Sequence, residues 1–441
     1  MQALDERLVR MISDSKGEPE WMLRIRLSAL AEFKRREMPK WQVLSLDGID
    51  FGSIRYYSKA GEMKRSWDDV PSEIKEVYEK MGIPEAEKKA LGGSIAQYQS
   101  ESIYESIKRE WEGKGVIFMS LDEALKRHPE MVRAYFAKAV PVGDNKFSAL
   151  HYTVWSGGSF LYVPKGVKVS VPMQVYFYMR DRAEGQFEHT LIIADEGSSV
   201  HFIEGCTAPV YDENSLHSAV VEVYAKEGSR VRYTTVQNWS KNVYNLNTKR
   251  AWVYKNALME WVGGSLGSKV SMLYPASVLM GEGARASHLT ITLVPPGTIK
   301  EGGAKVVHAA PNTISNIISK GICIGSGHGV YRGLVKISKG ARNSVASVRC
   351  DTLLIGENAK SDTFPLAQVD EQEGVSFNHE AVSGRISEEQ VSYIMSRGIS
   401  RQDAEMMYVS GFIRPVLDEI PLEYVIELNR FIGLEMEGSV G

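Results

Sequence analysis

A short turn recurs at a nearly constant interval through the middle of the chain. Each copy begins with Gly or Asn, the residues that best tolerate a left-handed backbone, and most copies follow Lys, Glu or Pro. A period near 28 residues indicates stacked units that cannot bury their apolar faces alone. The turns begin at Gly166, Gly197, Gly228, Asn256, Gly283, Asn312, Gly340 and Asn358, at intervals of 31, 31, 28, 27, 29, 28 and 18 residues.

Between these turns, from about Lys146 onward, short runs rich in Val, Ile, Tyr and Thr alternate with a period of two. A β-sandwich would need hairpins with Asn-Gly or Asp-Gly loops, and this region contains neither dipeptide. A parallel β-helix needs one turn type repeated in every coil, as seen here. We therefore predict an α+β chain whose core, residues 145–378, is a parallel β-helix of about eight coils.

Helix signals precede the repeat, in residues 1–144. Pro19 opens an apolar run with a 3.6-residue period, and a proline suits the first helical turn. Ser120 and Glu123 form a capping-box pattern, and residues 70–74 and 84–87 also resemble helix starts. The alternating stretch 49–57 indicates a short strand. We predict a helix-rich N-terminal domain.

Helix signals return after the repeat, in residues 379–441. Residues 387–390 and 400–403 are capping-box patterns that precede apolar stripes, and Pro415 and Pro421 interrupt these stripes. We predict a compact helical C-terminal domain. Because the ends of a β-helix are open unless they are capped or paired, we also expect a partner chain.

The charge balance and hydropathy exclude several classes of protein. A net charge of -3, from 52 Lys and Arg against 55 Asp and Glu, gives no broad attraction to nucleic acid or anionic lipid. The apolar stretches stay under about ten residues, whereas about 20 are needed to span a bilayer. Residues 1–8 carry two acids where a signal peptide would carry bases. We predict a cytoplasmic protein that binds neither nucleic acid nor membrane.

The only cysteines are Cys206, Cys323 and Cys350, without a C-x-x-C motif, so a closed four-thiolate site within one chain is disfavoured. Strand parity places Cys350 on the same face as Val348, as expected of a buried core thiol. Cys206 lies where a strand breaks into a Gly/Pro turn, which favours reaction with an external partner. Cys323, between two isoleucines, is predicted to be a core residue.

The usual catalytic signatures are absent or misplaced. The chain has no G-x-x-x-x-G-K-[ST] motif, so any ATP must be bound by a partner. Residues 263–267 match G-x-S-x-G, but a further strand is expected after them, where the nucleophile elbow needs a helix. The carboxylates nearest to a glycosidase arrangement have no spacing that requires a shared site, and these are Asp351, Glu357, Asp362 and Asp370.

Several long strings resemble the SufB-type scaffolds of the SufB/SufD family, which assemble iron–sulfur clusters in the SUF system. The likeness extends from about Gly17 to Gly441, essentially the whole chain. The strings that carry it are 155–160, 162–167, 203–209, 237–240, 331–335, 378–381 and 436–441.

The resemblance implies a right-handed parallel β-helix between helical domains, in agreement with the repeat. It also implies a complex in which the β-helix pairs with a SufD-type paralogue or with a second copy of itself. The C-terminal helices would dock a SufC-type ABC ATPase. A sulfur donor and apo iron–sulfur proteins would be further partners, and the cluster would be held transiently. Whether reduced flavin (FAD) supplies electrons in the complex stays open.

Residue by residue, the resemblance implies that Cys350 is a cluster-ligand thiol and that Glu380 is its carboxylate partner. The adjacent His379 is the alternative ligand, because the two side chains point in opposite directions only if the strand persists there. A mixed set of thiolate and harder ligands holds a cluster less tightly than four cysteines, which suits a scaffold that must release it.

The resemblance further implies that Cys206 accepts sulfur, which would pass through the β-helix interior toward Cys350. Gln237 and Trp239 match interior positions of that relay. The chain departs from bacterial members at two positions, where Tyr178 and Arg180 stand in place of Arg and Asn. Cys323 matches no family motif and is interpreted as structural.

Three hypotheses follow. The first is a non-enzymatic scaffold for iron–sulfur cluster assembly. The second is a β-helix polysaccharide lyase or hydrolase, which predicts activity in the isolated chain. The third is a structural adaptor for an ABC-type ATPase, for which Cys206 and Cys350 would be dispensable.

Overall fold

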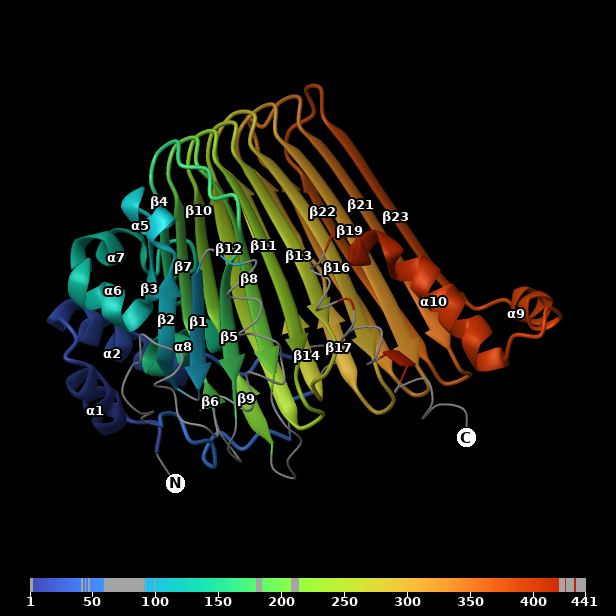
Figure 1. Cartoon of the computed structure of the whole chain (residues 1–441), viewed down its shortest axis with the longest axis horizontal. Coiled ribbons are helices and arrows are strands. Elements are labelled where there is room, and N and C mark those ends of the chain that lie inside the picture. The colour runs from blue at the N-terminus through green and yellow to red at the C-terminus, as the bar shows by residue number, and fades with distance from the viewer. Residues whose placement is uncertain are drawn as a thin grey trace.

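The computed structural model has a parallel β-helix at its centre, which confirms the fold predicted from the recurring turn. Two long sheets form its walls, and helices lie at both ends of the stack (Figure 1). The helix starts expected at 70–74 and 84–87 lie outside the described residues. The structure describes residues 3–40, 43, 45–46, 48–58, 91, 93–98, 100–179, 185–207, 214–419, 425 and 432–433.

The first wall, sheet 1, contains all three cysteines. Its strands from β1 to β23 are parallel to their neighbours, and only β2 pairs antiparallel, with β1. In spatial order the strands are β2 (Glu101–Ile107), β1 (Gly93–Tyr98), β5 (Met173–Tyr178), β8 (Ser199–Thr207), β11 (Arg230–Asn238), β13 (Leu258–Ser265), β16 (Arg285–Val294), β19 (Ile314–Ile324), β21 (Val345–Ile355) and β23 (Ser376–Arg385).

The opposite wall, sheet 2, is built from shorter strands, so that two of them share one long neighbour at several points. Its main path is β14 (Val270–Leu273), β17 (Ile299–Gly302), β20 (His328–Ile337), β18 (Lys305–His308), β15 (Ala276–Leu279), β12 (Val243–Val253), β10 (Val220–Ala225), β7 (His189–Ala194), β4 (Gly158–Val163) and β3 (Ile117–Ser120). Off this path, β22 (Lys360–Val369) pairs with β20, and β6 (Gly185–Gln186) and β9 (Ser215–His217) pair with each other.

The recurring turn forms one corner of the β-helix. Its Gly and Asn residues have positive φ, between 54° and 73° for the first six, which a residue with a Cβ adopts at a cost unless it is Asn. Each corner N–H donates to a carbonyl one coil further on. These bonds join Gly166 to Glu196, Gly197 to Glu227, Gly228 to Lys255, Asn256 to Glu282, Gly283 to Pro311, and Asn312 to Arg342, at 2.8–3.2 Å.

The last two predicted positions, at Gly340 and Asn358, are turns, but they do not continue this ladder of corner hydrogen bonds. The corner that follows Asn312 is Asn343 (φ 56°), whose N–H donates to Glu373, and the next is Gly374 (φ 67°). Gly340 also has positive φ, but its N–H donates to the Glu371 carboxylate, and Asn358 is not a positive-φ residue. With these positions the late intervals become 31 and 31 residues.

The number of coils is also lower than predicted. Along sheet 1 the eight strands β5, β8, β11, β13, β16, β19, β21 and β23 are separated by seven steps. The described residues therefore make about seven turns of the β-helix rather than eight.

The N-terminal region covers one end of the stack. The Ser120 hydroxyl accepts from the Glu123 N–H, which confirms that predicted cap, whereas Pro19 lies one residue before its helix, at the N-cap. The strand predicted at 49–57 is wrong, because this stretch forms turns that bury Ile49 and Ile54. The hairpin of β1 and β2 extends sheet 1 and was not predicted. The helices are α1 (Glu6–Lys16), α2 (Glu20–Arg35), α5 (Arg109–Gly113), α6 (Leu121–Arg127), α7 (Pro129–Tyr135) and α8 (Lys146–Val154).

Two helices follow the β-helix, α9 (Glu388–Met395) and α10 (Arg401–Leu417), as predicted for this region. The Ser400 hydroxyl caps α10 by accepting from the Asp403 N–H at 3.1 Å. Helix α10 crosses the outer face of sheet 1, where Val409 and Ile413 pack in one cluster with Ile291 and Leu353 (Figure 1). No helix in the described part of the chain has the length and hydropathy to cross a membrane.

Candidate functional site

Cys206 lies on β8 with its side chain buried in the core between the sheets. The expectation of an exposed turn thiol is therefore wrong, because the strand continues through residue 207 and turns the thiol inward. Gln237 on β11 stands directly opposite it in the parallel register. Burial, and then the nearby carboxylates of Glu204 and Glu188, raise the pKa of the Cys206 thiol well above its usual value.

A buried hydrogen-bond network surrounds Glu204, one inward-facing position before Cys206. Its Oε1 accepts from Lys249 Nζ at 2.6 Å, from Thr235 Oγ1 at 2.8 Å and from Gln237 Nε2 at 3.3 Å, and Oε2 accepts from Tyr233. Burial alone would raise the pKa of Glu204, but the Lys249 ammonium and these donors hold it below its usual value. The β-helix interior therefore carries a compensated charge pair next to the thiol.

The network continues on the other side of Gln237, where its Oε1 accepts from Asn245 Nδ2 at 2.5 Å. Asn245 Oδ1 in turn lies 2.7 Å from His217 Nδ1, and His217 Nε2 contacts the Glu188 carboxylate. The buried Trp239 ring packs on the His217 ring with centroids 4.4 Å apart. Both residues expected near the acceptor thiol, Gln237 and Trp239, thus lie in the polar interior around Cys206.

The strand register aligns two columns of small or polar residues along the inner face of sheet 1. One column begins at Cys206 and the other ends at Cys350. Because strands repeat at about 4.8 Å, the five steps from β8 to β21 separate the two thiols by roughly 24 Å. The first column is Cys206, Gln237, Ser265, Thr292, Gly321 and Thr352, and the second is Glu204, Thr235, Gly263, Thr290, Ser319 and Cys350.

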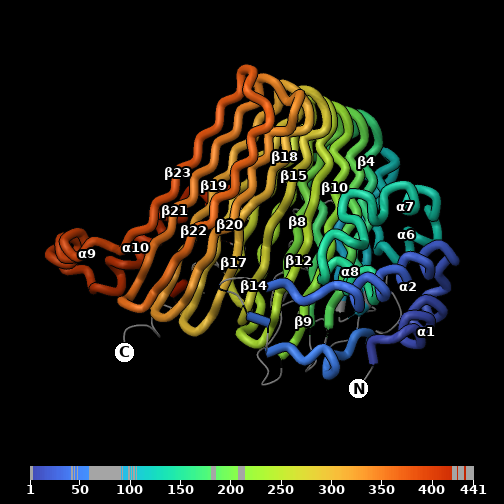
Figure 2. The backbone as a smooth tube through the Cα atoms, turned by 180° about the vertical axis from the view of Figure 1, so that it is seen from behind, coloured from blue at the N-terminus to red at the C-terminus, as the bar shows by residue number. Residues whose placement is uncertain are grey.

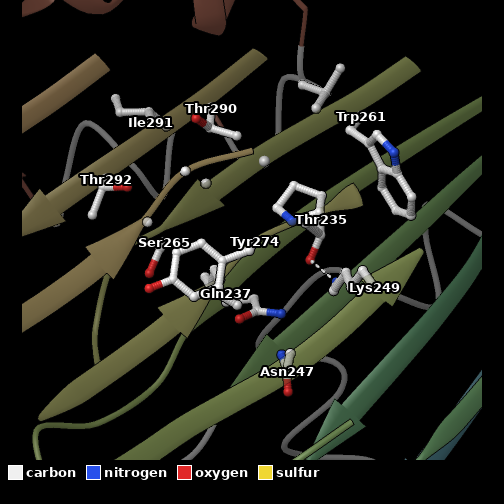
Figure 3. Close-up of a pocket in the computed structure, with 17 residues that line it drawn as sticks. Thr235, Gln237, Asn247, Lys249, Trp261, Ser265, Tyr274, Thr290, Ile291 and Thr292 are labelled. Carbon is white, nitrogen blue, oxygen red and sulfur yellow. Dashed lines mark hydrogen bonds between the residues drawn. The ribbon is translucent and has the colours of Figure 1, made fainter. Parts of the chain in front are cut away.

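Two cavities follow these columns. The first has a volume of about 50 Å³ and is lined by Gln237, Lys249 and Ser265 among others, as Figure 3 shows. The second, of about 30 Å³, reaches Cys350. Thr292 and Gly302 line both, so the cavities adjoin. Either volume exceeds what one water molecule needs. Together they mark a narrow path between the surroundings of Cys206 and Cys350, lined by apolar groups as well as by polar side chains such as Gln237 and Thr292.

Cys350 on β21 is also buried, as parity predicted, but it lies close to the last coil. Its Sγ is 3.5 Å from His379 Nε2 and 3.6 Å from the Glu380 carbonyl oxygen. Burial, and then the Asp351 carboxylate, raise the pKa of the Cys350 thiol to about 11, and burial lowers the pKa of His379. The imidazole is thus the neutral metal-ligand form at neutral pH.

The strand β23 persists through both candidate ligands, so their side chains point in opposite directions. His379 is half-buried on the face shared with Cys350, whereas the Glu380 side chain is exposed and accepts from Asn378 at 3.2 Å. The structure brings Cys350 and His379 together within this chain. It leaves the Glu380 carboxylate on the outer surface of the same strand.

The sequence hypotheses about the thiols and the relay also named Cys323, Tyr178 and Arg180. Cys323 is fully buried and packs with Val294 and Ala359, yet it also lines the cavity that reaches Cys350. Burial raises its pKa to about 11. Tyr178 is the last residue of β5, opposite Thr207, and Arg180 lies outside the described residues.

The glycosidase candidates do not share a site. Asp351 on sheet 1 is ion-paired with Lys320 at 2.5 Å and with Arg349 at 3.0 Å. Asp362 lies on sheet 2 and pairs with His328. The G-x-S-x-G string ends β13 and is followed by strand β14, as predicted, so it is no nucleophile elbow.

Sequence reasoning missed Glu204, Lys249, Glu188 and His217. The signal was present in the repeat, because aligning successive coils at the corner residues places Glu204, Thr235 and Gly263 in one column. Contacts between the two sheets could not be predicted by aligning the coils, because Lys249 and His217 come from sheet 2, whose strand lengths vary.

The fold and site define a β-helix protein that buries thiols along a polar interior and presents one of them near an open end. Two family models match the chain: the SUF system FeS cluster assembly SufBD core domain over residues 177–412, and the SufBD protein N-terminal region over residues 10–175.

Curated relatives agree with these family models. Iron–sulfur cluster assembly SufBD family proteins of Staphylococcus saprophyticus and Staphylococcus aureus are 52% and 51% identical over 441 residues, which is 100% of this chain and 94% of each relative. The chain belongs to the SufBD family of iron–sulfur cluster assembly proteins.

Proposed function

We propose that this chain is the scaffold subunit of a SUF-type assembly complex. It accepts sulfur and iron, builds a nascent cluster at an intersubunit interface and passes that cluster to apo-proteins in the cytoplasm. The chain works without a catalytic centre of its own, and a SufC-type ABC ATPase partner supplies the ATP-driven step. The observation that carries this proposal is the polar path along sheet 1 between the buried thiols of Cys206 and Cys350.

Sulfur enters at Cys206 as a persulfide and travels along the two columns. A separation of roughly 24 Å excludes direct attack of one thiol on the other, so a small carrier such as hydrosulfide must move between them. At Cys206, hydrosulfide attacks the outer persulfide sulfur, the bond between the two persulfide sulfurs breaks, and the Cys206 thiolate leaves, so that hydrogen disulfide (HS–S⁻) carries the sulfur. At Cys350 the thiolate attacks the outer sulfur of this carrier, forms the new persulfide and releases hydrosulfide again. Small side chains at Ser265, Thr292 and Gly321 leave room for such a carrier.

Within the chain, the nascent cluster is bound by Cys350 and His379, whose Sγ and Nε2 already lie 3.5 Å apart. Thiolate is the soft ligand that iron–sulfur clusters prefer, and imidazole can replace it. Glu380 lies on the outer face of the same strand and serves as a ligand from the subunit interface. This incomplete set needs donors from a second subunit, which makes the cluster releasable.

The second subunit pairs with the open end of the β-helix. Strands β22 and β23 form the last coil among the described residues, at one end of the stack (Figure 2). Several apolar side chains of these two strands are exposed. These include Leu366, Val369 and Val382, which are 55%, 42% and 59% exposed. Open strand edges with exposed apolar groups favour pairing with a further β-helix, either a SufD-type paralogue or a second copy.

The ATPase docks on the C-terminal helices. Tyr393 and Met395 of α9 and Met407 of α10 are exposed by 61%, 40% and 55%, although Ala404, Val409 and Ile413 of α10 are buried. An exposed apolar face on an otherwise packed helix is typical of a partner surface. In this proposal α9 and α10, within the predicted C-terminal domain 379–441, form the docking surface, whereas residues 376–385 form β23 in the last coil of the β-helix. The comparisons name no flavin, and FAD is not part of the proposal.

Anaerobic reconstitution with iron and sulfide in the complex with the ATPase tests this function. We expect Cys350→Ala to bind several-fold less cluster than the native chain, and Glu380→Ala to weaken cluster binding. Cys206→Ala should bind cluster normally from free sulfide but fail when sulfur comes from an enzymatic donor. Cys323→Ala is the matched thiol control. If the Cys350 variant, still paired, binds as much cluster as the native chain, the ligand assignment is wrong.

A further inference from the structure

Three potential metal ligands converge in the interior beside the acceptor thiol. They are a carboxylate oxygen of Glu188, Sγ of Cys206 and a ring nitrogen of His217, and these atoms lie within 4.8 Å of one another. All three residues are buried, and they come from different places in the coil: just before β7, on β8 and on β9. Ligands around one zinc ion stand about 3–4 Å apart, because metal–ligand distances are about 2.0–2.3 Å. Small shifts of the three side chains would therefore allow all of them to bind one metal ion.

The hydrogen bonds of His217 fix which of its nitrogens is available. Nδ1 lies 2.7 Å from Asn245 Oδ1, and Asn245 donates through Nδ2 to Gln237. Because a carbonyl oxygen only accepts, the proton of the neutral ring is on Nδ1, and the lone pair of Nε2 faces the Glu188 carboxylate. Two acceptors in contact require something between them, which is either a hydrogen carried by the ring or by the carboxyl group, or a metal ion.

Two further features favour the metal ion. Glu188 Oε2 is buried and has no hydrogen-bond partner among the described residues. The hydrogen bond from His217 Nδ1 to a carbonyl oxygen is the arrangement that orients histidine ligands in metal sites. A divalent ion would also balance one thiolate and one carboxylate in an interior where uncompensated charge is unfavourable.

We propose that Glu188, Cys206 and His217 form a binding site for one divalent transition-metal ion, Fe²⁺ or Zn²⁺. A donor set of one thiolate, one imidazole and one carboxylate suits these ions and excludes Mg²⁺, which takes oxygen ligands. Three protein ligands leave a fourth position for water or for an incoming sulfur species. This inference rests on the proposed function only in naming that species, because the ligand geometry stands without it.

Cobalt titration of the full chain tests the site, since Co²⁺ occupies zinc sites and gives a thiolate-to-metal charge-transfer absorption. The experiment uses a Cys350→Ala background, which removes the thiol near His379, and contains no sulfur donor. We expect one equivalent of Co²⁺ with the thiolate absorption, competed by Zn²⁺ and Fe²⁺ but not by Mg²⁺. Cys206→Ser should abolish the absorption, Glu188→Gln and His217→Gln should weaken binding at least about tenfold, and Asn245→Leu should weaken it about 10–100-fold.

Two control variants separate ligation from folding. His288→Gln removes another buried histidine, and Cys323→Ser removes another buried thiol, so neither should change the affinity. Circular dichroism establishes that each ligand variant is folded. A thiolate absorption that survives in Cys206→Ser, or an equal loss in His288→Gln, would overturn the site, as would the absence of Co²⁺ binding in the background chain.

The metal site and the sulfur function fail in different assays. Mass spectrometry of Cys206 after exposure to a persulfide donor reports sulfur acceptance alone. If the chain binds Co²⁺ but Cys206 accepts no sulfur, the proposed function is wrong and the metal site is still supported. If Cys206 accepts sulfur but the chain binds no Co²⁺, the metal site is wrong and the proposed function is still supported.

Discussion

The two ends of the polar path differ in how completely the β-helix encloses them. Around Cys206 the described side chains are buried, and Lys249 and Glu204 form an ion pair whose side chains are only 5% and 1% exposed. Around Cys350 the next strand, β23, is the last coil, and its outward side chains, including Glu380, face solvent. The surroundings of Cys206 are thus enclosed by the β-helix, whereas the site around Cys350 is open on one side and has only part of a ligand set.

This difference assigns separate tasks to the two thiols. A closed, charge-compensated interior protects a reactive sulfur from water and from the wrong thiols, as an acceptor requires. An open last coil lets a second subunit complete a ligand set and lets the product leave.

Lys249→Ala should destabilise the fold strongly, because it leaves the Glu204 carboxylate buried without its cation. Breaking a buried pair in this way costs about 3–5 kcal/mol of unfolding free energy. The measurement is the shift in the thermal unfolding midpoint. Lys165→Ala removes an exposed pair with Glu196, whose side chains are 75% and 51% exposed, and should change stability by under about 1 kcal/mol. Equal losses in both variants would contradict the closed interior.

At the open end, Val382→Asp should leave stability within about 0.5 kcal/mol of the native chain, because the side chain is 59% exposed. Association with a second β-helix subunit should weaken at least about tenfold, which corresponds to about 1.4 kcal/mol. Sedimentation measures this association. Met11→Asp, with a 41% exposed side chain on α1 at the other end, is the control and should associate normally. A loss of association in both variants would argue against the last coil as the interface.

Alkylation of the native chain should distinguish the thiols by pH. The pKa of Cys350 is raised to about 11 and that of Cys206 is raised well above its usual value, so both are neutral thiols at pH 7, and Cys350 lies closer to the open last coil. Because these pKa values exceed those in the unfolded chain, burial of the neutral thiols stabilises the fold fully below the unfolded pKa. That stabilisation is lost as the pH rises toward 11. Peptide mass mapping should show Cys350 modified first as the pH rises, and earlier modification of Cys206 would reverse the assignment.

The smallest effect concerns the corner ladder. Asn343→Ala puts a residue that tolerates a left-handed backbone poorly at φ 56° and removes the hydrogen bond that Asn343 donates to Asn312 Oδ1, so it should cost about 1–2 kcal/mol. Asn358→Ala should be nearly neutral, because Asn358 is not at positive φ. Comparison of the unfolding midpoints tests whether the ladder continues at Asn343. A larger loss at Asn358 would restore the corner first predicted from the sequence.

The sequence predicted the fold because one local requirement, a left-handed corner, repeats in every coil. It failed at Gly340 and Asn358, because a Gly or Asn near the right interval satisfies the pattern without being the residue whose N–H joins the next coil. Parity predicted the buried Cys350, but it could not rank His379 over Glu380 until the persistence of β23 was known.

The hydrogen-bond network around Glu204 could not be predicted from the repeat or from strand parity, for a different physical reason. Glu204 and Lys249 meet across the two walls, so their pairing depends on strand lengths and bends in sheet 2 rather than on a local pattern. In a sequence, a Glu and a Lys that pair in the interior cannot be distinguished from charged residues on the surface. The exposed-turn interpretation of Cys206 failed similarly, because Gly205 lies inside β8 and not at its end.

The central claim is that sulfur travels inside the β-helix, and one substitution can block that path. A Cβ on Gly263 would meet Thr235 and Thr290 at 3.6 and 3.7 Å, which are ordinary contacts, so Gly263→Val should fold while its methyl groups fill the first cavity. Gly384→Val is the control on another strand of the same sheet, because a Cβ there would meet nothing within 4 Å and Gly384 lines neither cavity.

The measurement is mass-spectrometric detection of labelled sulfur on Cys206 and Cys350 after delivery from a persulfide donor. In Gly263→Val we expect full labelling of Cys206 and at least about tenfold less label on Cys350, with both thiols labelled normally in Gly384→Val. Normal labelling of Cys350 in Gly263→Val, or in Cys206→Ala, would contradict the interior route.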